Sequence, residues 1–393
     1  MSQHKSFGAR RSAFERTINA LTSDVLARRA SGRPLLDLTR SNPTDPDLAF
    51  PYDAEAIRAA LADGGALRYA PEPFGLEAAR AAASASLPSS PGADRIFLTA
   101  STSEAYAYLF KLLCDPGDAV LVPEPSYPLF EHLARLEGVR LAPYRLAYDG
   151  AWHVDHDSVR AAAAGGARAV IVVSPNNPTG SFLKRDELAR LSELGLPIVS
   201  DEVFAEYALM ADQTRARTAR ESDRVLTFSM GGLSKSCGLP QMKLAWTAVT
   251  GPAADVEEAL ARLEIIGDAY LSASAPVQVA LPTLLSVGSV TRDAIRDRAR
   301  RNVTAIGATL AGAASPATLL RVEGGWTACV RLPKTRGEDA WVRGLLAEEG
   351  VLVQPGAYYD FAEEPMIVLS LLTAPRDLDE GLTRLVGHVA RHA

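Results

Sequence analysis

The sequence predicts an α/β fold in which helices cover both faces of a mostly parallel sheet. Two observations support this prediction. Short apolar runs rich in Val, Ile and Leu recur at residues 96–99, 119–123, 169–174, 197–201, 225–229 and 244–249. Amphipathic stretches separate most of these runs, as expected when each strand is buried on both sides beneath helices. A chain of 393 residues is also long enough for two to three domains with a substantial core.

The first elements precede this alternating region. Residues 11–30 place Phe14, Ile18, Leu21, Val25 and Leu26 at helical spacing, which predicts a helix that ends before Gly32, Arg33 and Pro34. Residues 35–38 form a short apolar run, and the Asn and Pro residues after it indicate a strand followed by a turn.

The pattern changes again beyond about residue 285. Helical stretches at 291–312 and 338–350 are mixed with short strand-like runs at 327–332, 351–355 and 366–372, which is typical of a separate α+β unit. We expect residues 1–50 to form an N-terminal segment that joins the small domain. Residues 51–287 should form the large α/β domain, and residues 288–393 the small domain.

Composition and charge narrow the class of protein and its partners. Apolar residues make up 47% and charged residues 22%, as in soluble globular proteins. The 41 basic and 47 acidic side chains leave a net charge of −6, which does not attract nucleic acid or anionic lipid. The three cysteines, Cys114, Cys237 and Cys329, show no disulfide or zinc spacing. We therefore expect a cytoplasmic protein that binds small molecules and no metal, nucleic acid or membrane.

Polar residues follow five of the predicted strands. They occupy positions 100–104, 124–128, 175–180, 201–202 and 230–235. Ligands of open α/β sheets bind outside the carboxyl ends of the strands, so these residues should meet at one edge. Each also has a simpler interpretation: Ser101 to Ser103 could only cap a helix, and Lys235 could be an ordinary surface lysine.

The order and spacing of these motifs resemble class I/II aminotransferases, which are fold-type I pyridoxal-phosphate enzymes. The resemblance is carried by DLTRSNPT, RYAPEPFGLEAAR, TASTSEA, DPGDAVLVPEPSYP, SPNNPTG, SDEVFAEY, GGLSKSCGLP and VLVQPGAYYDF. It implies a three-layer large domain that binds pyridoxal 5'-phosphate. It also implies an enzyme that moves an amino group between an amino acid, or an amine, and a 2-oxo acid by a ping-pong mechanism.

The resemblance also implies roles for individual residues. Lys235 would form the Schiff base with the cofactor and later move a proton, while Asp201 would pair with the pyridine nitrogen. Asn177 would bind the ring hydroxyl and Tyr127 would stack on the ring. The remaining cofactor-binding candidates would all approach the phosphate: Ser101, Thr102, Ser103, Lys243 and Tyr69. Tyr69 matches a tyrosine that reaches the neighbouring subunit, which implies a homodimer with shared active sites.

Four positions depart from the family pattern. Gly232 stands where a serine is common, Lys243 where an arginine is common, and Phe204 where a tyrosine usually assists the ring hydroxyl. By register, Val368 replaces the arginine that binds the substrate α-carboxylate. An apolar side chain cannot make those charge-assisted bonds.

Two explanations of the missing arginine stay open. Another cation could bind the carboxylate, with Arg40 as the candidate and Asn177 beside it in the substrate pocket. Alternatively, the substrate lacks an α-carboxylate, or the reaction is a β-lyase, decarboxylase or C–C bond-forming reaction on the same cofactor. A cofactor-binding regulatory module without enzymatic activity is a further alternative.

Overall fold

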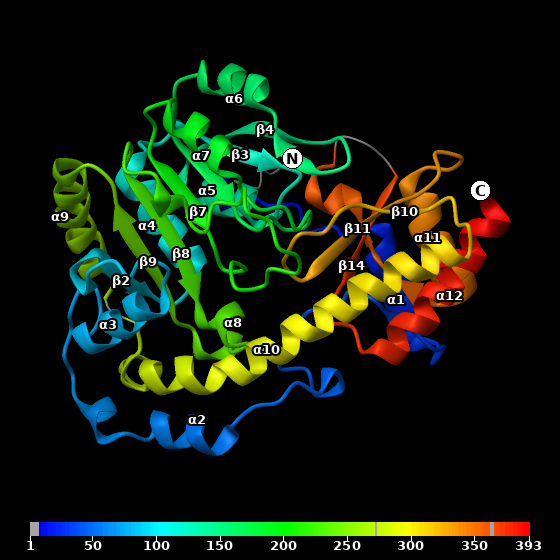
Figure 1. The fold of residues 1–393 in the computed structure, drawn as a ribbon, viewed down its shortest axis with the longest axis horizontal. Coiled ribbons are helices and arrows are strands. Elements are labelled where there is room, and N and C mark those ends of the chain that lie inside the picture. Colours follow the sequence, from blue (N-terminus) through cyan, green and yellow to red (C-terminus); the bar gives the residue numbers. More distant parts are fainter. Residues whose placement is uncertain (1–7, 272, 362–364) are drawn as a thin grey trace, which may run out of the picture.

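The computed structural model describes residues 8–271, 273–361 and 365–393. Its centre is an eight-stranded sheet (Figure 1). In spatial order the strands are β2 (Ile96–Thr99), β9 (Ala245–Thr250), β8 (Thr227–Gly232), β7 (Ile198–Asp201), β6 (Ala167–Val173), β3 (Ala119–Glu124), β4 (Arg140–Tyr148) and β5 (Trp152–Val154). The strands from β8 to β4 run parallel, while β9 is antiparallel to both of its neighbours and β5 is antiparallel to β4. The predicted α/β class is confirmed.

All six apolar runs that the sequence singles out lie in this sheet. The two strands it misses are β4 and β5, at one edge of the sheet, where Arg140, Arg145 and His153 are exposed. An edge strand that is only half covered does not need a continuous apolar run, so its sequence lacks the signal.

Helices cover the two faces of the sheet. They are α2 (Ala54–Leu61), α3 (Glu77–Ser86), α4 (Thr102–Leu113), α5 (Leu129–Glu137), α6 (His156–Ala163), α7 (Arg185–Ser192), α8 (Leu233–Ser236) and α9 (Ala253–Tyr270). Phe228 and Met230 of β8 pack with α4, α5 and α9, whereas Trp246 and Ala248 of β9 pack with α2, α3 and α10 (Ala275–Gly312). The side chains of the strands thus alternate between two cores.

A second, smaller layer lies beside the large sheet (Figure 1). Its antiparallel strands are, in spatial order, β10 (Thr318–Leu319), β11 (Thr327–Arg331), β14 (Met366–Ser370) and β13 (Gln354–Pro355). The helices there are α1 (Ala20–Ala30), α11 (Glu338–Glu349) and α12 (Pro375–His392), and β1 (Leu36–Asp37) pairs in parallel with β12 (Val351–Leu352). The N-terminal segment therefore lies against the C-terminal part of the chain.

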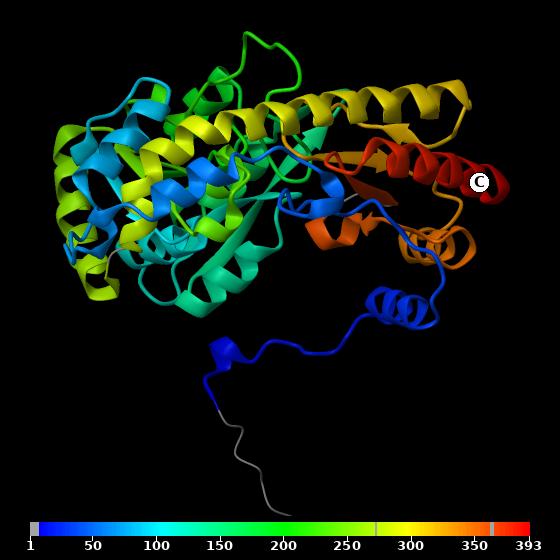
Figure 2. The same cartoon turned by 90° about the horizontal axis from the view of Figure 1, so that it is seen from below.

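The long helix α10 extends across both parts of the molecule (Figure 2). It begins at Ala275, earlier than the predicted start at residue 291, and it contains Pro282 near its first turns. The chain passes through positions 287 and 288 within this helix, so no linker marks the expected division. The domain boundaries stay a prediction.

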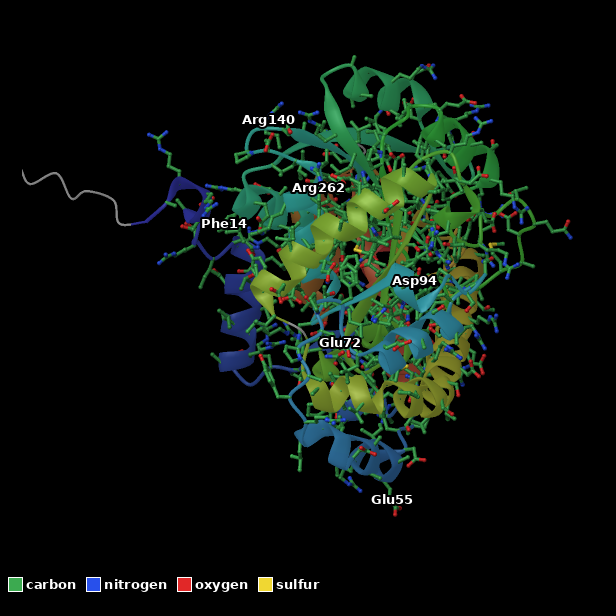
Figure 3. The ribbon with its side chains drawn as sticks, turned by 90° about the vertical axis from the view of Figure 1, so that its left-hand side faces the viewer. Phe14, Glu55, Glu72, Asp94, Arg140 and Arg262 are labelled. Carbon is green, nitrogen blue, oxygen red and sulfur yellow. The ribbon has the colours of Figure 1, made fainter. Side chains whose placement is uncertain are left out.

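The first predicted helix is shorter than expected. Helix α1 begins at Ala20 because the side chain of Asn19 caps it, accepting a hydrogen bond from the Thr22 N–H at 2.8 Å. Phe14 lies outside the helix (Figure 3). It packs instead on His132 of α5, with ring centroids 4.7 Å apart.

Short 3-10 turns complete the structure. They are η1 (Arg10–Ser12), η2 (Pro46–Leu48), η3 (Gly64–Leu67), η4 (Ala93–Arg95), η5 (Ala219–Glu221), η6 (Pro240–Met242) and η7 (Gly356–Tyr359). Among the described helices, none combines the length and the apolar character that crossing a membrane requires.

Candidate active site

A cavity of about 500 Å³ opens at the carboxyl ends of the parallel strands. Its wall combines the start of α4, the ends of β6 and β7, helix α8, and residues of β11, β13 and β14 from the smaller sheet. Eight residues proposed from the sequence line this one cavity: Ser101, Thr102, Ser103, Tyr127, Asn177, Asp201, Lys235 and Lys243.

Lys235 lies in α8, the single helical turn that follows β8. The Nζ atom is 4.7 Å from the centre of the Trp326 ring and 5.4 Å from that of Phe204. Its backbone carbonyl accepts a hydrogen bond of 2.5 Å from the Tyr207 hydroxyl, which fixes the turn. Burial lowers the pKa of the Lys235 ammonium, against the opposing effect of the Asp201 charge. A larger fraction of this amine is therefore neutral and nucleophilic.

Asp201 ends the neighbouring strand β7. One carboxylate oxygen accepts the Val203 N–H at 3.2 Å, and the other accepts the Tyr106 hydroxyl at 3.3 Å. Burial is the main cause that raises the pKa of Asp201 to about 6, partly offset by these two hydrogen bonds and by Lys235. The group is ionised at neutral pH, but its charge is poorly solvated.

Tyr106 also lines the cavity and was not proposed from the sequence. It follows Thr102 by four residues on α4, so both side chains lie on the same face of the helix. This spacing is the signal that could have identified it. Trp326 is buried in the core and also contributes to the cavity wall.

The start of α4 forms one end of the cavity. Ser101 is the N-cap, and its hydroxyl accepts the Glu104 N–H at 3.1 Å. The first turn of a helix leaves backbone N–H groups without intrahelical partners and carries a partial positive charge, which suits a phosphate. Lys243 lines the same cavity and adds a positive charge to it.

Gly232 explains one departure from the family pattern. A Cβ atom at this position would lie 3.1 Å from the Cα of Ala245, the first residue of the paired strand β9, and 3.1 Å from the carbonyl oxygen of Leu244, which precedes it. The backbones of β8 and β9 are too close there for a serine without a local shift.

The turn that carries Asn177 is held by its neighbour. The Asn176 Oδ1 atom accepts the Thr179 hydroxyl at 3.0 Å, and the Asn176 N–H donates to the Ser181 carbonyl at 2.8 Å. Asn177 is therefore available to the cavity, and its Oδ1 atom is buried with no hydrogen-bond partner among the described residues.

Two proposed residues do not line the cavity. Tyr69 is 83% exposed. The Arg40 guanidinium is held by Asp45, through the Nε atom at 2.9 Å and a second contact, and by Asp47 at 2.9 Å. Its neighbours Thr39 and Ser41 do line the cavity. The role of Arg40 stays a prediction.

Val368, which by the resemblance stands where an arginine would bind the substrate carboxylate, is fully buried. Val368 is 1% exposed and lies between Cys329 and Gln354 in the small sheet. Ser370, two residues later, lines the cavity, and its hydroxyl donates to the Arg40 carbonyl at 2.6 Å.

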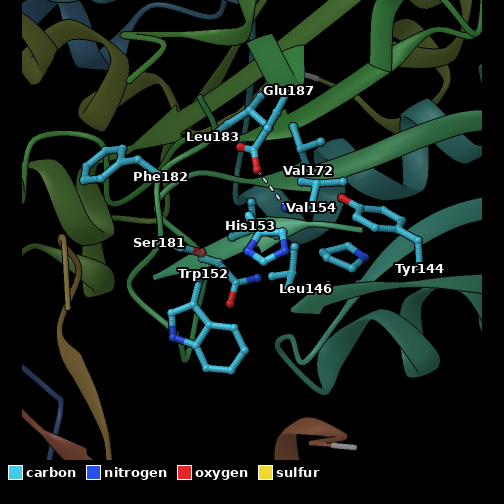
Figure 4. Close-up of a pocket in the computed structure, with 13 residues that line it drawn as sticks. Tyr144, Leu146, Trp152, His153, Val154, Val172, Ser181, Phe182, Leu183 and Glu187 are labelled. Carbon is cyan, nitrogen blue, oxygen red and sulfur yellow. Dashed lines mark hydrogen bonds between the residues drawn. The ribbon is translucent and has the colours of Figure 1, made fainter. Parts of the chain in front are cut away.

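A second cavity is too small for a cofactor (Figure 4). It lies beside β5, where Glu187 accepts the Val154 N–H at 2.7 Å, and encloses about 20 Å³. That volume holds about one water molecule.

Comparison with known proteins identifies the family. Residues 33–385 match the family described as aminotransferase class I and II. Nicotianamine aminotransferase B of Hordeum vulgare is 31% identical over 268 residues, covering 64% of this chain and 48% of that protein. Glutamate-pyruvate aminotransferase of Escherichia coli strain K12 is 28% identical over 196 residues, covering 49% of this chain and 48% of that protein. The chain thus spans about half the length of the curated relatives it matches.

The fold also resembles that of solved aminotransferase structures. The structure of alanine aminotransferase from Pyrococcus furiosus superposes with a TM-score of 0.84 at 21% identity, covering 98% of this chain and 100% of that one. The resemblance drawn from the motifs is confirmed: this chain belongs to the class I and II aminotransferase family.

Proposed function

We propose that this protein is a pyridoxal-phosphate-dependent aminotransferase that moves an amino group between an amino acid, or an amine, and a 2-oxo acid by a ping-pong mechanism. The observation that carries the proposal is the convergence of Lys235, Asp201, Asn177 and Tyr127 on one cavity. The named relatives differ in their amino donors, so the proposal stays at this class of substrate.

The chemistry of Asp201 supports the fit of the cofactor. Its hydrogen bonds to the Val203 N–H and the Tyr106 hydroxyl come from neutral donors, and burial disfavours its charge. A protonated ring nitrogen would give this carboxylate a cationic partner. The amide of Asn177 would meet the ring hydroxyl and Tyr127 the ring face, while the start of α4 and Lys243 would bind the phosphate.

The bound cofactor supplies an electron-withdrawing ring that stabilises negative charge at the substrate α-carbon. Lys235 would hold the cofactor covalently, and its amine, when free, would remove a proton from that carbon. Asp201 would keep the ring nitrogen protonated. Trp326 and Phe204 cover the Lys235 Nζ atom and reduce its hydration, which favours the neutral amine.

The substrate carboxylate requires a further cation. We retain Arg40 as the proposed partner, because Thr39 and Ser41 place this segment on the cavity wall and Ser370 holds its backbone there. The Arg40 side chain would have to leave Asp45 and Asp47 to make this contact. Asn177, in the turn after β6, would bind the same substrate.

We also propose a cytoplasmic homodimer with shared active sites. Leu67 and Tyr69 are 92% and 83% exposed, and Tyr270 and Leu271 add further exposed apolar surface. Large apolar side chains left exposed in this way are typical of an interface, and Tyr69 would then reach the partner's cofactor. All three cysteines are free thiols, which suits a reducing compartment.

Substitution of Lys235 by Ala should prevent covalent attachment of the cofactor to the protein. We expect purified wild-type protein mixed with pyridoxal 5'-phosphate to gain a protein-bound visible absorbance band that amino donors bleach. The Lys235→Ala variant should lack this band and all transferase activity, while Lys111→Ala, a surface lysine, should behave as the wild type. A normal band in Lys235→Ala would refute the assignment.

Substitution of Arg40 by Ala tests the carboxylate contact. Loss of a charge-assisted hydrogen bond should raise the KM for an amino acid donor by about tenfold or more and leave the KM for a carboxylate-free amine unchanged. Arg33→Ala serves as the control. An unchanged KM for amino acids removes Arg40 from this role, and preferential use of carboxylate-free amines would support the alternative substrate class.

Substitution of Asp201 by Asn should change the pH dependence of stability in the cofactor-free protein. Because the folded pKa of Asp201 lies near 6 rather than 3.8, the folded state binds more protons between these values and loses stability as pH rises through them. The free energy of unfolding, measured with urea, should therefore rise in the variant relative to the wild type, and this rise should be about 2–3 kcal/mol larger at pH 8 than at pH 4. An equal effect at both pH values would contradict this.

A further inference from the structure

We propose that Tyr106 is a positioning residue for the cofactor's ring nitrogen, acting through Asp201: its hydroxyl orients the carboxylate and keeps it ionised. This inference rests on the proposed function. None of the family motifs assigned a role to Tyr106.

The geometry places the Tyr106 hydroxyl directly against Asp201. The hydroxyl lies 3.3 Å from the Oδ2 atom, while the Val203 N–H binds the Oδ1 atom at 3.2 Å. Each carboxylate oxygen thus has one donor from the protein. This arrangement fixes the plane of the carboxylate and leaves further lone pairs for a donor in the cavity.

Packing restricts the Tyr106 ring. The side chain is 3% exposed, and its ring meets Phe130 edge to face with centroids 5.3 Å apart. Phe110, one turn later on α4, lies 6.0 Å from the same ring. A hydroxyl on a ring held in this way is preorganised, so it orients Asp201 without first losing much conformational freedom.

The hydroxyl serves as a donor over the whole working range of pH. Burial, and next the charge of Asp201, raise the pKa of Tyr106 well above its usual value, so the phenol stays protonated. The groups that face Asp201 are Tyr106 from α4, Lys235 from α8, Tyr127 from the loop after β3, and the Val203 N–H. Tyr144 of β4 also acts on the Tyr106 hydroxyl.

Removal of the Tyr106 hydroxyl should therefore shift the pKa of Asp201 in a defined direction. The hydrogen bond from Tyr106 lowers the pKa of Asp201, so Tyr106→Phe should raise that pKa and leave less carboxylate charged at a given pH. Binding through the protonated ring nitrogen would weaken, and its loss on acidification would begin at a higher pH than in the wild type.

Cofactor affinity provides a test that does not depend on catalysis. Cofactor-free protein is titrated with pyridoxal 5'-phosphate and, separately, with its 1-deaza analogue, in which carbon replaces the ring nitrogen. Dissociation constants are read from tryptophan fluorescence. Tyr106→Phe should bind the natural cofactor about tenfold more weakly and the analogue as tightly as the wild type does.

Tyr108→Phe is the matched control. Tyr108 is also buried on α4, but its ring packs against Tyr270 rather than beside Asp201. This variant should bind both compounds as the wild type does.

Two results would overturn the role of Tyr106, and a third would refute the proposed function. An equal loss of affinity for both compounds in Tyr106→Phe would show a general packing role, and an unchanged affinity for both would show no role; either overturns the inference. Wild-type protein that binds neither compound would instead refute the proposed function.

Discussion

The site depends on one electrostatic constraint, the burial of a carboxylate and an amine at the ends of adjacent strands. Asp201 ends β7, and Lys235 follows β8, which pairs with β7. Burial disfavours both charges, raising the pKa of Asp201 and lowering that of Lys235. A neutral amine is the form that reacts with an aldehyde. A buried, poorly solvated carboxylate is stabilised most by a cationic partner. The fold thus prepares both groups before any ligand arrives.

The parallel sheet brings the strand ends together, and the small sheet closes the cavity over them. Glu323, which is 3% exposed, joins the two parts: it accepts the Lys184 ammonium at 2.6 Å and the Phe182 N–H at 3.0 Å. Its backbone carbonyl also accepts the Leu209 N–H at 2.9 Å. These contacts fix the segment that carries Trp326 above the Lys235 Nζ atom.

The sequence could predict the residues whose position follows from the strands alone. Asp201 ends a buried apolar run, and Asn177 and Lys235 each follow such a run within a few residues, so the α/β arrangement is enough to bring them to one edge. Tyr106 could not be assigned in this way, because its contact with Asp201 depends on how α4 packs on the sheet. The side-chain direction of Arg40 depends on Asp45, which caps the short 3-10 turn η2, and on Asp47 within it, where the sequence has no periodic signal. The late start of the first helix depends on a single N-terminal cap at Asn19.

Covalent attachment of the cofactor at Lys235 can be tested by chemical trapping. Protein loaded with pyridoxal 5'-phosphate is reduced with borohydride, digested, and mapped by mass spectrometry. We expect a pyridoxyl group on the peptide that contains Lys235. A modification confined to another lysine, or no modified peptide, would contradict it.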